Sequence, residues 1–254
     1  MKRKSGRREF IKSFGIGTLG ATVLPAGALR QVDTGNNPDS LPPDGLNETT
    51  KRAYNGVYTG PYLNRLAFPV GGLGAGMFCI EGTGAISHMS IRNKPEMFNE
   101  PGMFAAISLK GITNGAKVLE GQVPDWKKFG QREAGNGSAG STNGLPRFRE
   151  TSFKTFFPFC TIDLQDDDLP LAVQLTGWSP FIPTDEENSS LPAGALEYRF
   201  TNTGKSTLDG VFSFNAKNFL KVDKGRNNIR SFPKGFILSE AGTPEKPLRT
   251  DLAI

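Results

Sequence analysis

The chain has 254 residues, of which 37% are hydrophobic, and it contains 31 glycines, 18 prolines and 19 phenylalanines. This length allows one or two domains with a real core, and the many turn-forming residues favour short strands over long helices. The formal net charge of +5 lies entirely in residues 1–28, because the rest of the chain carries 24 basic and 24 acidic side chains. Because residues 29–254 carry no net charge, they give no evidence for nucleic acid as a partner.

The first 28 residues read as an export signal. Arg7 and Arg8 follow a basic head, and a glycine-rich, mildly apolar run leads to the small-x-small site that ends at Ala28. General secretory signals are more apolar in their middle, so the pattern predicts a bacterial twin-arginine signal, the twin-arginine translocase as a partner, and a periplasmic or extracellular protein. Residues 13–29 are too short and too interrupted to span a membrane, and we expect no stable membrane span elsewhere.

Residues 29–60 are polar and rich in proline, and we expect them to form a partly disordered lead-in to a domain over residues 61–254. Early in that domain, Gly72, Gly74 and Gly76 follow one another at every second position. A dinucleotide fingerprint would need a glycine where Met77 stands, so we expect no nucleotide cofactor. The glycines favour a hairpin entry where the backbone bends or lies close to another segment.

Short strands are predicted along the rest of the chain. The alternation is cleanest in 171–176, 196–201 and 212–215, where apolar and polar residues take turns. The predicted strands are 85–92, 104–110, 153–164, 171–177, 195–202, 208–216 and 235–239. Residues 130–144 read as a flexible loop. These signals predict a mostly β fold, a two-sheet antiparallel β-sandwich.

The one histidine and the two cysteines do not indicate a catalytic or metal site. His88, the one histidine, is predicted to be a hydrogen-bonded strand residue, and with it alone we expect no transition-metal site. Cys79 and Cys160 are predicted to be buried free thiols, with a disulfide between them as the alternative.

Three charged clusters have ordinary explanations. The run from Asp166 to Asp168 is predicted to be a tight turn between two strands, with a calcium site as the alternative. The pair Lys127 and Lys128, and the basic residues of 221–230, are predicted to lie on the solvated surface.

Residues 177–192, GWSPFIPTDEENSSLP, predict a stiff corner between strands. Pro180 and Pro183 restrict φ and withhold amide donors, so the segment runs along a sheet edge or around a bend. We expect Trp178, Phe181 and Ile182 to form a hydrophobic plug beneath the corner.

The acids of the corner are predicted to face solvent. Thr184 or Asp185 is positioned to cap a short turn. Adjacent acids on a corner are not opposed across a bond, so Asp185, Glu186 and Glu187 are read as solvated turn acids, with a contact to sugar or to a partner domain as one alternative and catalysis as another.

Two long segments together resemble the N-terminal domain of glycoside hydrolase family 116, the family of non-lysosomal glucosylceramidase and bacterial β-glucosidases. They are FPVGGLGAGMFCIEGTGAISHMSIRNKPEMFNEP and LTGWSPFIPTDEENSSLPAGALEYRFTNTG. The likeness covers roughly residues 60–220. It implies a β-sandwich that packs against a helical C-terminal catalytic domain, and a retaining enzyme that cleaves the O-glycosidic bonds of β-glucosides.

The resemblance also implies that the catalytic carboxylates belong to that helical domain, beyond the end of this chain, so we expect no catalytic residue here and an inactive fragment. One alternative is a stand-alone exported module that binds carbohydrate or supports assembly, with aromatics such as Trp126 or Tyr58 stacking on sugar rings. Another is an exported oxidoreductase, against which the failed glycine pattern counts.

Overall fold

The computed structural model describes residues 53–91, 94–96, 100–129, 142–220, 226–241 and 250–254, all within one compact unit, Arg52–Ile254. The export signal with Arg7, Arg8 and Ala28, the lead-in up to residue 52, and residues 130–141 of the predicted loop lie outside the described residues. Among the described residues, no helix is both long and apolar enough to cross a membrane.

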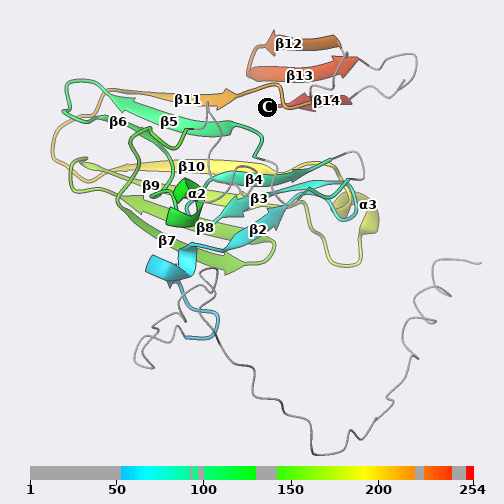
Figure 1. The fold of residues 1–254 in the computed structure, drawn as a ribbon, viewed down its shortest axis with the longest axis horizontal. Helices are drawn as coiled ribbons and strands as arrows, with labels where there is room; N and C mark the ends of the chain where they lie inside the picture. The colour runs from blue at the N-terminus through cyan, green and yellow to red at the C-terminus, as the bar shows by residue number, and fades with distance from the viewer. Residues whose placement is uncertain (1–52, 92–93, 97–99, 130–141, 221–225, 242–249) are drawn as a thin grey trace, which may run out of the picture. The chain divides into compact units, whose positions relative to one another are not determined.

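A five-stranded antiparallel sheet forms one layer of the fold (Figure 1). Its strands, in spatial order, are β1 (Tyr58–Thr59), β7 (Glu150–Phe156), β8 (Phe159–Gln165), β9 (Leu171–Trp178) and β10 (Ala195–Asn202). In β9, Leu171, Val173 and Leu175 are buried while the residues between them are half-buried, which confirms the predicted alternation.

The predicted strand 153–164 is wrong, because two strands occupy that region. β7 and β8 form a hairpin in which Phe156 pairs with Phe159, and Phe157 and Pro158 make the turn. Pro158 has no amide hydrogen to donate to a neighbouring strand, so a single continuous strand through it would lose a ladder bond.

Two three-stranded sheets lie against the five-stranded sheet. One is β2 (Ala67–Val70), β3 (Met77–Glu81) and β4 (Ile86–Ser90), and the other has the spatial order β11 (Gly210–Ala216), β5 (Met103–Leu109) and β6 (Ala116–Val118). One buried cluster joins all three sheets, with members such as Val70, Ile107 and Ile162. Because the core lies between opposed antiparallel sheets, the predicted β-sandwich is confirmed.

The edge strands β10 and β11 are less covered than their alternation suggested. Leu196 and Phe214 pack against the core, but Phe200 and Phe212 remain exposed. Phe212 instead contacts Tyr198 and Phe200, with ring centroids 5.4 and 5.9 Å apart. Aromatic side chains of β10 and β11 therefore pack against one another between the two sheets, although Phe200 and Phe212 are still partly open to solvent.

A further sheet contains β12 (Arg226–Phe232), β13 (Gly235–Ala241) and β14 (Thr250–Ala253). β13 confirms the predicted strand 235–239, whereas β12 and β14 were not predicted. Asn218 connects this sheet to the end of β11, because its side-chain amide donates to the carbonyl oxygens of Asn228 and Ser239. Residues 227–230 are exposed, as predicted for the basic segment that contains them.

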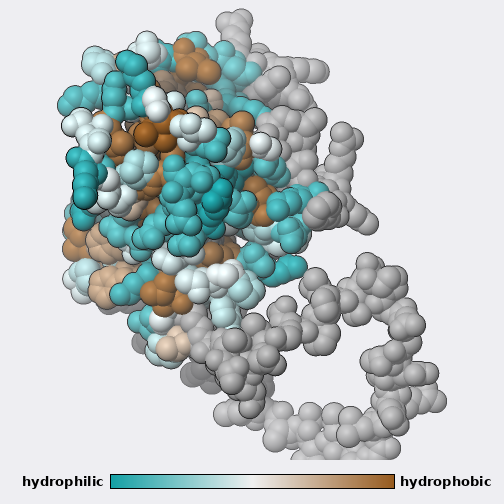
Figure 2. Space-filling view, turned by 90° about the vertical axis from the view of Figure 1, so that its left-hand side faces the viewer, coloured by the Kyte–Doolittle hydropathy of each residue, from teal (hydrophilic) through white to brown (hydrophobic). Residues whose placement is uncertain are grey.

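Three short helices complete the described structure: η2 (Gly60–Leu63), α2 (Asp125–Phe129) and α3 (Glu186–Ser189). At the end of the sandwich where β5 is joined to β6 and β10 to β11, hydrophilic residues alternate with small groups of hydrophobic ones (Figure 2). Such a mixed surface is typical of loops that connect strands and face solvent.

Candidate functional site

A cavity of about 350 Å³ lies among the end of β3, the beginning of β5 and the helix α2. Glu81 is the last residue of β3, Met103 is the first of β5, and Lys127 lies in α2. Among the described residues, three carboxylates and three basic side chains line this space: Glu81, Glu100, Glu120, Lys127, Arg147 and Lys217. The charged side chains of the described lining therefore balance, three of each sign.

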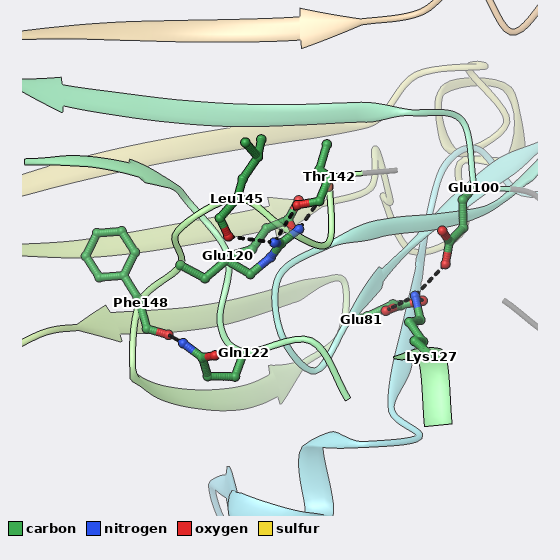
Figure 3. Close-up of polar contacts among 9 residues, drawn as sticks. Glu81, Glu100, Glu120, Gln122, Lys127, Thr142, Leu145 and Phe148 are labelled. Atoms are coloured by element: carbon green, nitrogen blue, oxygen red, sulfur yellow. Dashed lines mark hydrogen bonds and ion pairs between the residues drawn. The ribbon is translucent and has the colours of Figure 1, made fainter. Parts of the chain in front are cut away.

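Lys127 connects two of the carboxylates (Figure 3). Its ammonium group lies 2.7 Å from Glu81 Oε1 and 2.6 Å from Glu100 Oε1, and the Lys127 side chain is only 7% exposed. Burial acts to lower the pKa of Lys127, but the two carboxylates outweigh it and raise that pKa above its ordinary value. Lys127 therefore stays charged and holds both glutamates.

Glu120 and Arg147 form the second ion pair of the cavity. Arg147 donates from Nε and Nη2 to Glu120 Oε2, at 3.2 and 3.1 Å. Arg147 also donates to the carbonyl oxygens of Thr142 and Leu145, which fixes residues 142–145 at this end of the cavity (Figure 3). Burial raises the pKa of Glu120 above its ordinary value, and Arg147 offsets part of that rise.

The arrangement is suited to binding rather than to glycosidic catalysis. A retaining glycosidase needs one carboxylate free to attack and a second free to exchange a proton. Here Glu81 and Glu100 share one lysine, and Glu120 is held by an arginine. Ion pairs of this kind keep the carboxylates as fixed acceptors.

The prediction that Lys127 is solvated is wrong, although its neighbour Lys128 is exposed as predicted. Trp126 and Tyr58, named as exposed platforms for sugar rings, are only half-exposed and otherwise engaged. The Trp126 ring nitrogen donates to the carbonyl oxygen of Asn64 at 2.7 Å, and Tyr58 packs edge-on against Phe153. Sequence patterns carried no signal for this cavity, because its ion pairs join distant segments.

The two segments that carry the family resemblance meet in the structure. Leu73 donates its amide to the carbonyl oxygen of Ser189 at 2.8 Å, and the Gly71 amide donates to Ser179 Oγ at 3.0 Å. A Cβ on Gly72 would lie 2.0 Å from the carbonyl oxygen of Leu191. The glycine run is therefore a close backbone approach, as predicted, and its partner is the corner 177–192.

The predicted hydrophobic plug beneath that corner is wrong. Trp178 and Ile182 are exposed, the latter by 51%, and Phe181 is half-buried. Trp178 and Phe181 adjoin the turn of the β7–β8 hairpin, because Trp178 pairs with Phe159 and the ring centroids of Phe181 and Phe157 lie 5.0 Å apart. We call these residues, with Phe156, the hairpin–corner face; its members are Phe156, Phe157, Phe159, Trp178, Phe181 and Ile182.

The acids of the corner behave as predicted. The side chain of Asp185 caps α3 by accepting from the Asn188 amide at 3.0 Å. That hydrogen bond, together with one from the Asn188 side chain, lowers the pKa of Asp185. Glu186 and Glu187 are exposed in the first turn of α3, where carboxylates interact favourably with the helix dipole.

The aspartate run is a turn between β8 and β9, also as predicted, with the Leu169 amide donating to the Asp166 carbonyl oxygen at 3.1 Å. Asp166 has a role that was not predicted, because its buried carboxylate pairs with Lys117 of β6. In the described part of the chain, no three His, Cys, Asp or Glu residues are grouped so as to hold a metal ion.

His88 lies in β4, and its Nδ1 is 2.6 Å from Ser87 Oγ, so the prediction of a hydrogen-bonded strand residue is confirmed. Cys79 and Cys160 are buried free thiols, which confirms that prediction and excludes the alternative disulfide from this structure. Burial raises the pKa of Cys79 to about 11 and that of Cys160 to about 12.

A comparison with protein families shows which family the chain resembles. Residues 67–246 match the model of the N-terminal domain of glycosyl-hydrolase family 116, described as beta-glucosidase 2. A search among curated proteins found no match. The matched range runs from β2 to beyond β13, so it includes the cavity and both segments that meet at Gly72.

Proposed function

The chain belongs to glycoside hydrolase family 116 through its N-terminal domain, and we propose that it serves as the β-sandwich part of a retaining hydrolase that cleaves the O-glycosidic bonds of β-glucosides. The single observation that carries this proposal is the family match over residues 67–246 of a chain that folds as a β-sandwich. The catalytic carboxylates would belong to the helical catalytic domain that the resemblance implies.

The ion pairs of the cavity support a non-catalytic role for this part of the enzyme. Each glutamate that lines the cavity is held by a basic side chain. An attacking carboxylate in a retaining glycosidase must reach the anomeric carbon, with the second carboxyl about 5–5.5 Å away. We therefore assign no catalytic role to Glu81, Glu100 or Glu120.

The hairpin–corner face is the surface we propose for contact with the catalytic domain. Phe156 is 71% exposed, and it lies among other large apolar side chains that rigid elements present: a hairpin turn and a proline-bounded corner. Contiguous exposed apolar residues of this kind mark interaction surfaces. A rigid face loses little conformational entropy on binding.

Activity assays test this proposal. The purified chain is expected to be inactive on an aryl β-glucoside, and turnover is expected when a helical catalytic domain of family 116 is supplied as a separate chain. Phe156→Ser and Trp178→Ser should weaken the association of the two chains by about tenfold or more. Val211→Ser, at an apolar side chain that is 68% exposed outside the face, is the matched control. Turnover by the chain alone that is lost on substitution of one of its own carboxylates would overturn the proposal.

We also propose that the protein is exported by the twin-arginine route, with Arg7 and Arg8 as the recognised pair and cleavage after Ala28. Lysine at both arginine positions should keep the protein in the cytoplasm at its full mass. The matched control replaces Lys2 and Lys4 by arginine, which preserves the charge of the basic head. Export of the double-lysine variant at the normal level would contradict the proposed route.

A further inference from the structure

The cavity beside α2 offers more than a set of ion pairs. Its volume of about 350 Å³ falls in the range of small-molecule sites, about 300–1,000 Å³. Apolar side chains share the lining with the charged ones, among them Phe104, Ile86 and Val123. Such a mixture of fixed polar groups and apolar walls is typical of a ligand site.

Glu120 has an acceptor that the ion pair does not use. Both hydrogen bonds from Arg147 end on Oε2, and no described residue donates to Oε1. The residue is only 6% exposed and lines the cavity, but its Oε1 is not among the buried side-chain oxygens that lack a partner, so water in the cavity reaches it. A hydroxyl group brought by a ligand would replace that water as a donor to Oε1.

Two asparagines line the same space. Asn215 of β11 pairs directly with Phe104 of β5, and residues opposite each other on neighbouring antiparallel strands project to the same side of the sheet. Asn215 thus sets an amide beside an aromatic ring in the cavity lining, and its Nδ2 donates to Ser213 Oγ at 3.2 Å, which uses one of its two amide hydrogens. Asn143, which is half-buried, contributes a second side-chain amide from the segment 142–145 that Arg147 fixes.

The charges decide what kind of molecule fits. The three carboxylates are matched by three basic groups among the described lining residues, so the cavity is formally neutral. A charged ligand would leave a net charge in this half-enclosed space, which is unfavourable without a partner. Hydroxyl groups both donate and accept, so they suit a lining of carboxylates and amides.

We propose that this cavity binds a neutral, polyhydroxylated molecule about the size of one hexose, with Glu120, Asn143 and Asn215 as hydrogen-bond partners of its hydroxyl groups. Phe104 would cover an apolar side of the ligand. Binding here is separate from hydrolysis, since it requires neither the hairpin–corner face nor a catalytic domain.

Titrations followed by NMR of the ¹⁵N-labelled protein test the proposal. The probes are D-glucose and myo-inositol, which are neutral, D-gluconate, which is an anion, and D-glucosamine, which is a cation. The neutral probes are expected to shift the side-chain amide signals of Asn143 and Asn215 with dissociation constants on the order of millimolar. The charged probes should bind about tenfold more weakly or worse.

Variants separate a specific site from general effects. Asn143→Ala and Asn215→Ala should each weaken glucose binding by about fivefold, and Glu120→Gln by about tenfold, in line with neutral and charged hydrogen bonds. Glu197→Gln, on the exposed part of β10, is the control and should bind as the parent does. If Glu120→Gln fails to fold, the two asparagine variants still decide the question.

Three results would overturn the proposal: no shift with either neutral probe at high concentration, unchanged affinity in both asparagine variants, or equally strong binding of gluconate or glucosamine. Each is distinct from failure of the proposed hydrolase role, which is measured by turnover with the catalytic domain.

Discussion

The backbone of Gly72 lies against the carbonyl oxygen of Leu191, so closely that a Cβ at residue 72 would be 2.0 Å from that oxygen. The contact joins the entry to β3 with the corner that precedes β10, although the two residues are far apart in the chain. Only a residue without a side chain fits between these two backbones.

Gly72→Ala is therefore expected to destabilise the protein by about 1–3 kcal/mol or more, because backbone atoms must move to admit the methyl group. Gly144→Ala is the matched control, since a Cβ there meets no atom within 4 Å. Urea denaturation of both variants measures the difference. Equal stability of the two variants would show that the approach at Gly72 is looser than described.

Lys127 and Lys128 are expected to differ sharply although they are adjacent. Lys127→Met should lower the free energy of unfolding by about 3–5 kcal/mol, because it leaves Glu81 buried without its partner. Lys128→Met should change it by about 0.5 kcal/mol or less, since that lysine forms only an exposed pair with Asp125. Thermal or urea unfolding compares them, and similar losses in both would refute the assigned role of Lys127.

Acid should destabilise the protein partly through Asp166. Burial acts to raise the pKa of this carboxyl, but hydrogen bonds from Lys117 and from the Asp168 amide lower it below its ordinary value. A group whose pKa is lower in the folded state stabilises the protein above its unfolded pKa of about 3.9 and loses this effect as the pH falls further.

Asp166→Asn should therefore lower the free energy of unfolding at pH 7. In this variant, the free energy of unfolding should also decrease less steeply with falling pH below about pH 4. The control is Asp209→Asn, because Asp209 forms an exposed pair with Lys110 and should leave the pH profile unchanged. Urea unfolding at several pH values from neutral to strongly acidic gives both profiles. If the free energy of unfolding of Asp166→Asn depended on pH as it does in the parent protein, Asp166 would not be a source of the acid sensitivity.

The two thiols should resist modification in the folded protein. Cys79 and Cys160 are buried, with the pKa raised to about 11 and about 12, so very little thiolate is present at pH 8. A thiol reagent such as Ellman's should label both only after denaturation, and reducing agent should not change the melting temperature. The variants Cys79→Ser and Cys160→Ser show which thiol accounts for each part of the labelling. Rapid labelling of either thiol in the native protein would contradict its burial.

The amino-acid sequence by itself determined the local features of the fold. Alternation at Leu171, Val173 and Leu175 identified a strand and its buried side, because side chains in a strand point to opposite faces in turn. Gly72 indicated a close approach, and Thr184 or Asp185 was predicted to cap a short turn, where the structure has Asp185 capping α3. Each of these signals depends on a few neighbouring residues, whose conformational preferences act wherever the segment lies.

Only the tertiary structure decided which of these surfaces are covered. Lys127 is buried and Lys128 is exposed because Glu81, 46 residues earlier, lies beside one of them and not the other. Trp178 and Ile182 face solvent although their composition predicted a buried plug. Burial depends on which distant segment packs against a side chain, and periodicity within one strand carries no information about that segment.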